Sequence, residues 1–230
     1  MPQNQPAAPA RVLTLAAHAE QVLREMIFSG ELASGVRISA EEAAEKLGMS
    51  PIPVREALRS LASRGLVEAV ARRGFRVRPA DRQDFAETYQ LRMLLDPFAA
   101  ELAVPRMDRA AIAEMDRALA NLERTMLSND TGSYDAHHRA FHFSVYNHAG
   151  SRWLLDIQAM LWENSQRYQR LSASVRGTPE DRVAEHRAIA EACRRGDGAE
   201  AARLVRRHLD FTQAVVFPAL DAQEHDLESP

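Results

Sequence analysis

Cysteine is nearly absent from this 230-residue sequence, in which Cys193 is the single cysteine. One thiol cannot form a disulfide within the chain, so the framework of a small secreted disulfide protein is excluded. Long apolar runs are also missing, since none approaches the ~20 residues that a membrane helix needs. The uncharged start MPQNQPAAPA lacks the apolar segment of a signal peptide. Together these absences predict a soluble, cytoplasmic protein with no membrane partner.

A strong net charge is lacking as well, because the formal net charge is −3, which does not indicate a polybasic nucleic-acid binder. The charge is unevenly spread, however. Residues 11–78 carry 11 Arg and Lys against 8 Asp and Glu, whereas residues 79–230 carry 18 against 24. A mildly basic head on an acidic body is typical of a DNA reader joined to a second module. We therefore predict a disordered N-terminus (1–10), a DNA-binding domain (11–78), a helical domain (79–220) and a tail (221–230).

The first domain shows a helix-turn-helix pattern followed by a hairpin. Apolar residues recur at helical spacing over 11–29, and capped helices are predicted over 40–47 and 51–65, with a glycine-containing turn between them. Valine-rich halves around an Arg-Arg-Gly tip predict a hairpin over 66–79. A winged helix-turn-helix has this order of elements, and it places the second helix of the pair in the major groove of DNA.

Helical periodicity dominates the rest of the chain. Short connections between the helices predict an antiparallel six-helix bundle, so that the whole fold is mainly α. The expected helices cover about 81–104, 108–128, 131–149, 151–173, 179–195 and 197–217.

Candidate DNA contacts lie at the start of the second helix and at the hairpin tip. Arg can grip guanine O6 and N7 with two hydrogen bonds, and Ser50 at a helix N-terminus can donate to a phosphate. Arginines at a hairpin tip can reach the DNA backbone or the minor groove. For an isolated Arg, an ordinary solvated helix face is the alternative interpretation. The predicted DNA-binding residues are Ser50, Ile52, Pro53, Arg55, Arg59, Arg72, Arg73 and Gly74.

The stretch MSPIPVREALRSLASRGLVEAVARRGFRV resembles the DNA-binding module of the GntR family of bacterial regulators. The PVREAL run, the GLV ending and the Arg-Gly wing tip carry this resemblance, which covers residues 11–78. The family commonly has Arg after the Ser, where this chain has Pro51 followed by Ile52, so a usual DNA contact is replaced. The resemblance implies a homodimer on a palindromic double-stranded operator that regulates transcription, more often as a repressor.

Four of the eight histidines lie close together in the stretch AHHRAFHFSVYNH, residues 136–148. At 100° per residue, His138 and His142 share the apolar face of the predicted helix. His137 and His148 lie nearer the edge of that face. The inward pair has the i, i+4 spacing at which two imidazoles can reach one metal ion.

Two later histidines also sit on apolar helix faces. His186 is followed by Ile189, Ala190 and Cys193 at helical spacing, and His208 lies between apolar residues in the same way. Three helices thus turn histidines into the bundle, where polar groups need partners. Spacing alone leaves two alternatives open, a shared metal ion or core histidines that are bonded separately.

The stretches HHRAFHFSVYNHAGSRWL and EHRAIAEACRRGDGAEAARLVRRHL resemble the FCD effector domain of FadR-type GntR regulators, over about 81–217. Many members bind a divalent metal through an Asp, a His four residues later, and two further histidines. The resemblance implies the ligands His138, His142, His186 and His208, with His138 in place of the usual Asp. Zinc or nickel suits imidazole ligands. Four neutral imidazoles would leave the full metal charge uncancelled, which favours a small organic acid as effector.

Arg92 is the predicted effector-binding residue, because an Arg on an apolar stripe needs an anion. That anion is either Asp96, four residues later, or an effector carboxylate held jointly by Arg92 and the metal. Asp135 either bonds a ligating imidazole or is an ordinary surface carboxylate. Further candidates for the same pocket are Tyr134, Asn164 and Tyr168.

The predicted function is that of a transcriptional regulator, not an enzyme, whose operator affinity responds to a carboxylate at a histidine-bound metal. A constitutive DNA-binding regulator with a purely structural metal is the alternative. A metal-dependent hydrolase is disfavoured, because no Glu accompanies the histidines as it does in His-Glu-x-x-His.

Overall fold

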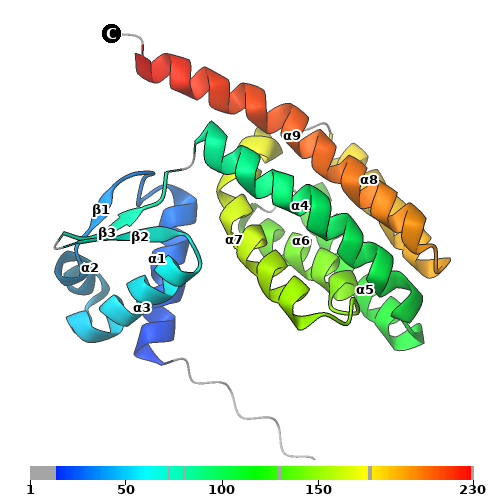
Figure 1. Cartoon of the computed structure of the whole chain (residues 1–230), viewed down its shortest axis with the longest axis horizontal. Helices are drawn as coiled ribbons and strands as arrows, with labels where there is room; N and C mark the ends of the chain where they lie inside the picture. The colour runs from blue at the N-terminus through cyan, green and yellow to red at the C-terminus, as the bar shows by residue number, and fades with distance from the viewer. Residues whose placement is uncertain (1–13, 72, 80, 129–130, 176–177, 229–230) are drawn as a thin grey trace, which may run out of the picture. The chain divides into compact units, whose positions relative to one another are not determined.

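The computed structural model describes residues 14–71, 73–79, 81–128, 131–175 and 178–228. The chain divides into two compact units, Met1–Pro79 and Ala80–Pro230 (Figure 1). Each unit has its own hydrophobic core. The N-terminal segment that the sequence predicts to be disordered, residues 1–10, lies outside the described residues.

The first unit is a winged helix-turn-helix, as the sequence predicts. Three helices and a small antiparallel sheet of order β1-β3-β2 build it, and α1 and α3 pack against each other. The strand β1 is absent from the predicted elements, because two residues are too few to show the alternation of a strand. The elements are α1 (Leu15–Ser29), β1 (Arg37–Ile38), α2 (Ala40–Leu47), α3 (Pro51–Ser63), β2 (Val67–Val70) and β3 (Gly74–Val77).

The inward face of α3 sets the direction in which its outer face points. Val54, Ala57, Leu58 and Leu61 recur at helical spacing and are almost completely buried. They pack into the core of the first unit together with residues of α1 and the sheet. Burial of this stripe stabilises the unit by roughly 25 cal/mol per Å² of apolar area and fixes the rotation of α3 about its axis.

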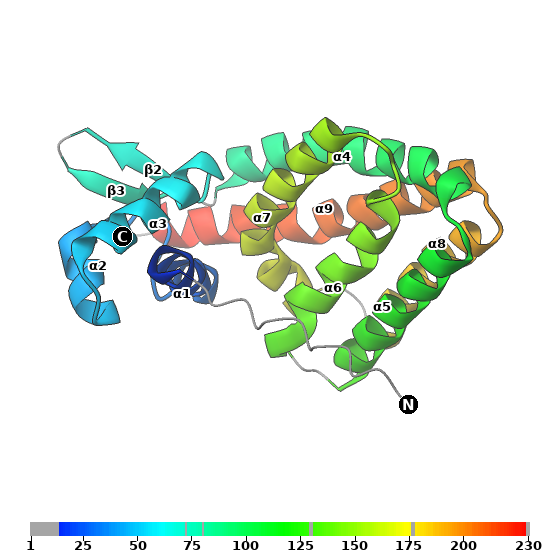
Figure 2. The same ribbon diagram turned by 90° about the horizontal axis from the view of Figure 1, so that it is seen from below.

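The second unit contains the six helices that the sequence predicts. The helix α4 runs along α9, α5 lies against α6 and α8, and α8 lies against α9 (Figures 1 and 2). A short 3₁₀ turn, η1 (Val104–Arg106), follows α4. The helices are α4 (Arg82–Ala103), α5 (Arg109–Leu127), α6 (Thr131–Tyr146), α7 (Arg152–Val175), α8 (Pro179–Arg194) and α9 (Gly198–Glu228).

Two helix ends differ from the predictions. The helix α6 stops at Tyr146 instead of near 149, ahead of Gly150, which has the positive φ of 74° that glycine adopts readily. The helix α9 runs to Glu228, although the sequence predicts its end near 217 and a tail from 221. Good helix formers follow Pro218 and no glycine interrupts them, so the helix continues through the proline. Residues 229 and 230 lie outside the described part of the chain.

Across the described ranges, none of the helices combines the length and the apolar character that crossing a bilayer requires.

Candidate functional site

Four buried histidines meet inside the second unit. His138 and His142 come from α6, His186 from α8 and His208 from α9, and each is at most 5% exposed. One possible ligand nitrogen from each ring lies within 4.8 Å of the others. The structure therefore brings together the set of side chains that the sequence and the FCD resemblance single out.

The spacing of the two α6 imidazoles suits ligands of one ion. Nε2 of His138 and Nε2 of His142 are 3.1 Å apart. Two nitrogens bound to a tetrahedral zinc ion at about 2.0–2.1 Å would lie about 3.3 Å apart. The donor set is chemically uniform and buried, and imidazole nitrogens are ligands that zinc and nickel accept. The residues present therefore fit a divalent metal ion.

Hydrogen bonds on the outer side of two rings select the tautomer that a metal needs. Nδ1 of His186 lies 2.7 Å from the carbonyl oxygen of Arg182, and Nδ1 of His208 lies 2.9 Å from Oε2 of Glu185. A carbonyl or a carboxylate only accepts, so each Nδ1 carries the hydrogen and donates. In the neutral ring Nε2 then keeps its lone pair, which is the arrangement of metal-ligating histidines.

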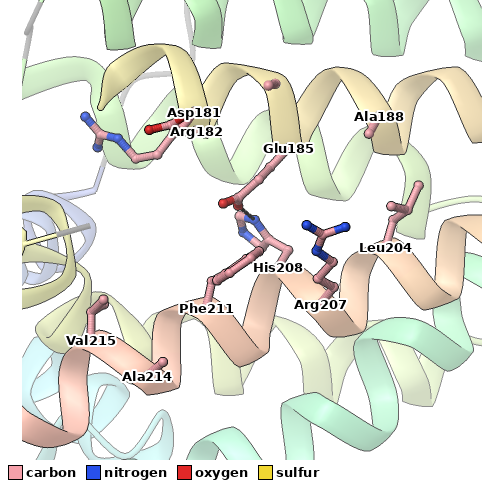
Figure 3. A pocket seen from close by; sticks show the side chains of 11 residues that line it. Asp181, Arg182, Glu185, Ala188, Leu204, Arg207, His208, Phe211, Ala214 and Val215 are labelled. Atoms are coloured by element: carbon pink, nitrogen blue, oxygen red, sulfur yellow. Dashed lines mark hydrogen bonds and ion pairs between the residues drawn. The ribbon is translucent and has the colours of Figure 1, made fainter. Parts of the chain in front are cut away.

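Glu185 faces a groove between α8 and α9 of about 550 Å³. Its carboxylate points from α8 toward the His208 ring on α9, and Arg207 extends from α9 toward α8 beside it (Figure 3). The Glu185 side chain is 22% exposed, whereas that of His208 is 4% exposed. Glu185 and His208 both line the groove, so the imidazole cluster borders it on this side.

His142 has a phenol as its outer neighbour. Oη of Tyr146 lies 3.4 Å from Nδ1 of His142, and both residues are buried. Burial raises the pKa of Tyr146 well above its usual value, with the nearby Asp96 acting in the same direction. The phenol is therefore neutral and does not add a charge to the cluster.

Trp162 of α7 forms one wall beside the imidazoles. Its ring centre is 5.1 Å from that of His138 and 5.3 Å from that of His142. Trp162 is 1% exposed, and among the described side chains its Nε1 has no hydrogen-bond partner. The same holds for Oε1 of Gln158, one helical turn earlier on α7. A buried donor next to the cluster and a buried acceptor one turn away on α7 therefore remain unsatisfied, which is uncommon in protein interiors.

Arg92 pairs with Asp96, one of the two anions that the sequence allows. Nε and Nη2 of Arg92 donate to Oδ2 of Asp96 at 3.0 and 2.9 Å, and Nη1 donates to Ser165. Burial opposes the charged guanidinium, but Asp96 and nearby phenols outweigh it and raise the pKa of Arg92. Its guanidinium carbon lies 4.7 Å from the centre of the Trp162 ring. Arg92 is therefore one aromatic ring away from the histidines.

The other candidate pocket residues divide into two groups. Tyr134 stacks on His138, with ring centres 5.2 Å apart. Asn164 instead donates to a carbonyl of its own helix, and Tyr168 donates to Asp84 at 2.6 Å. His137, which helical geometry placed off the inward face, lies 2.7 Å from the hydroxyl of Thr125, outside the four-histidine cluster.

Sequence reasoning missed Glu185, and it left open whether Asp135 bonds an imidazole or is an ordinary surface carboxylate. Asp135 is half-buried on α6, and Glu185 is the carboxylate that bonds Nδ1 of His208. Glu185 immediately precedes His186, so the two side chains leave α8 in different directions. Only the packing of α8 on α9 brings Glu185 to His208, 23 residues later, and no local pattern in the sequence reports this.

The candidate DNA-binding residues of α3 lie on its outer side. Ser50 precedes the helix and is exposed, and its side chain makes no capping hydrogen bond. Ile52 is 72% exposed and Pro53 is half-buried. Nη2 of Arg55 lies 2.6 Å from Oε1 of Glu41, an ion pair in which both side chains are more than half exposed. The remaining candidate, Arg59, is exposed.

The wing tip has one position that requires glycine. Gly74, the first residue of β3, has a φ of +84°, and an added Cβ would lie 2.9 Å from the backbone oxygen of Ile38. The backbone N–H of Arg73 donates to the carbonyl of Val70, which closes the turn. Arg73 is exposed, whereas Arg72 lies outside the described residues.

Comparison with known proteins gives the same two-part division. Residues 15–77 match the bacterial regulatory proteins of the gntR family, and residues 87–211 match the FCD domain. The HTH-type transcriptional regulator BphR of Paraburkholderia xenovorans is 29% identical over 90% of this chain and 87% of its own length. The HTH-type transcriptional repressor GlaR of Escherichia coli is 28% identical over 76% and 82%. The solved structure of E. coli McbR/YncC superposes with a TM-score of 0.77 at 21% identity, covering 90% of this chain and 99% of that one.

Proposed function

The chain belongs to the GntR family of bacterial regulatory proteins and carries an FCD domain, and from this premise we propose a metal-dependent, ligand-responsive repressor. The relatives that it matches are transcriptional regulators and not enzymes, and GlaR is a repressor. The winged module binds operator DNA. A metal ion in the helical unit holds a small carboxylate, and this effector changes the affinity of the operator complex.

The observation that carries the metal proposal is the buried four-histidine cluster, with one ligand nitrogen from each ring within 4.8 Å of the rest. His138, His142, His186 and His208 would hold the ion. When bound, a divalent ion supplies a Lewis-acidic positive charge to which a carboxylate can bind. The outward hydrogen bonds of His186 and His208 support this assignment, because they place the hydrogen on Nδ1 and leave the lone pair of the neutral ring on Nε2.

Three features next to the cluster support a carboxylate as effector. Four neutral imidazoles cancel none of the metal charge, so an anion is favoured beside them. The indole N–H of Trp162 is a buried donor without an acceptor in the described part of the chain, and a carboxylate oxygen would satisfy it. The Arg92 guanidinium packs against the same indole ring, so we assign Arg92 a positioning role through Trp162 as well as the ion pair with Asp96.

The second candidate function, a constitutive regulator with a structural metal, is favoured by the number of histidines. Four protein ligands complete the tetrahedral shell of a structural zinc ion and leave no position for an effector. Nickel accepts imidazole and takes more than four ligands, so an effector-binding site favours nickel here. The two functions therefore differ in the coordination number of the ion that the cluster selects.

Exposed apolar stripes support a homodimer. Leu91, Leu94 and Phe98 share the outer face of α4, and Trp153, Ile157 and Met160 share that of α7. The helices α4 and α7 pack against each other. Groups of large exposed apolar side chains mark association surfaces in soluble proteins. A dimer would present two winged modules to a palindromic operator.

Calorimetry and gel shifts on the full chain test this proposal. Zinc or nickel is titrated into chelator-treated protein, into the double variant His186→Ala/His208→Ala, and into His137→Ala, whose ring lies outside the cluster. We expect tight binding to the wild type and to the control but not to the double variant. Equal binding by all three proteins would overturn the metal assignment.

A panel of small organic acids, titrated into the metal-loaded protein, separates the two candidate functions. Heat from one acid, together with altered mobility of an operator complex, supports the ligand-responsive regulator. The absence of heat from every acid, with DNA binding retained, supports the structural metal.

For the DNA assignment, Arg55→Ala should abolish operator binding and leave the helical circular dichroism unchanged.

A further inference from the structure

The recognition helix α3 begins with an exposed isoleucine. Ile52 is 72% exposed, the largest exposed fraction among the large apolar side chains that the structure describes in the first unit. The buried stripe of α3 faces the core, so its rotation is fixed with Ile52 on the outer side. Arg55 and Arg59 follow three and seven residues later, which places them on the same face as Ile52. The N-terminal residue of the face that carries Arg55 and Arg59 is thus aliphatic.

Few backbone N–H groups at the start of α3 can donate a hydrogen bond to a phosphate. Backbone N–H groups of the first turn usually bind phosphate at a helix N-terminus. Here Pro51 and Pro53 occupy the first and third helical positions, and proline has no N–H. Among the first three helical residues only Ile52 offers a backbone donor. The start of α3 is therefore better suited to an apolar contact than to a charge-based one.

Arg55 does not fill the gap at the helix start. Its guanidinium pairs with Glu41 of α2 at 2.6 Å, and this contact holds it one turn further along α3. Hydrogen bonds from its own backbone and from Ser39 lower the pKa of Glu41, and Arg55 adds to this effect, so the carboxylate stays charged. With Arg55 held by Glu41, the exposed side chain of Ile52 remains as an apolar group at the N-terminal end of α3.

We infer that Ile52 contacts the C5 methyl group of a thymine in the major groove and makes thymine the preferred base at that operator step. The thymine methyl is the apolar group that the major groove presents, and it distinguishes thymine from the other bases. This inference rests on the proposed function, because it requires that α3 enters the major groove. The inference extends the proposed function by naming the base that the start of α3 prefers.

The experiment uses the full chain and a duplex enriched by it from a random pool. Each thymine of that duplex is replaced in turn by deoxyuridine, which keeps the hydrogen-bonding groups and lacks only the methyl. At one step in each half-site we expect about a fourfold loss of affinity, the factor that corresponds to ~0.8 kcal/mol for one buried carbon. In the variant Ile52→Ser the same replacement should have no effect.

A matched control removes another exposed aliphatic side chain. Leu15 at the start of α1 is 65% exposed, and Leu15→Ser should keep the wild-type response to deoxyuridine. Circular dichroism checks that both variants are folded. If no sequence is enriched from the pool, the proposed function fails. If a sequence is enriched but no replacement weakens binding, or the loss persists in Ile52→Ser, the inference about Ile52 is overturned alone.

Discussion

Replacing Glu185 by Gln should weaken metal binding without removing a metal ligand. Oε2 of Glu185 accepts a hydrogen bond from Nδ1 of His208 at 2.9 Å, and its negative charge makes the ring a more basic ligand. Loss of such a partner typically costs 10–100-fold in metal affinity. Because Glu185 is 22% exposed, water screens part of its charge, and we expect about tenfold, or ~1.4 kcal/mol.

Thermal unfolding converts this loss into a measurable shift. At a metal concentration 100 times the wild-type Kd, binding stabilises the protein by about 2.7 kcal/mol, and a tenfold weaker site by about 1.4 kcal/mol. The difference lowers Tm by about 3–5 °C, since 1 kcal/mol corresponds to roughly 2–4 °C at this chain length.

The same comparison without metal isolates the contribution of the protein itself. In chelator, Glu185→Gln should unfold close to the wild type, because glutamine keeps an acceptor for Nδ1 of His208. Glu180→Gln, an exposed acid in the first turn of the same helix, is the control and should behave as wild type in both conditions. An equal shift with and without metal would refute the reasoning, because Glu185 would then act on folding and not on the ion.

Three further changes test other parts of the helical unit. His138→Asp should keep metal binding and weaken the binding of an organic acid, since the carboxylate cancels part of the metal charge; unaltered acid affinity by calorimetry contradicts the charge argument. Asp96→Ala should cost about 3–5 kcal/mol in urea unfolding, because it leaves the Arg92 charge buried without its anion, and a loss below 1 kcal/mol argues against that pairing. Burial raises the pKa of Cys193 to about 12, so a thiol reagent at pH 8 should label it only after unfolding, and fast labelling of the folded protein would contradict its burial.

Patterns within a single element were sufficient to predict the helices and the inward histidines. The i, i+4 spacing places His138 and His142 on one face of α6, and apolar neighbours do the same for His186 and His208. That the three helices bring these rings to one point depends on how the helices pack, which spacing alone left open. The FCD resemblance supplied this step, and the structure places the four rings together.

Contacts between different helices and strands could not be predicted from the sequence, because they depend on how these elements pack. The partner of Arg92 could be narrowed to two anions, because Asp96 is one turn away on the same helix. The partner of His208 could not be predicted, because Glu185 lies on another helix and its approach to His208 depends on the register of α8 against α9. The same limit applies to β1, whose two residues form a strand only through pairing with β3.

Because the four histidines come from α6, α8 and α9, an ion bound to them would tie three helices of the second unit to one point. An effector alters operator affinity only if it binds two arrangements of the protein with different affinities. In the proposed site, a carboxylate that joins the ion would also contact Trp162 of α7, whose ring packs against the guanidinium of Arg92 from α4. The proposed metal alone would therefore restrain α6, α8 and α9, whereas the metal with its effector would restrain α4 and α7 as well. The helix α4 begins at Arg82, next to the boundary with the DNA-binding unit, so in this proposal the effector, and not the metal alone, would act on the helix that follows that unit.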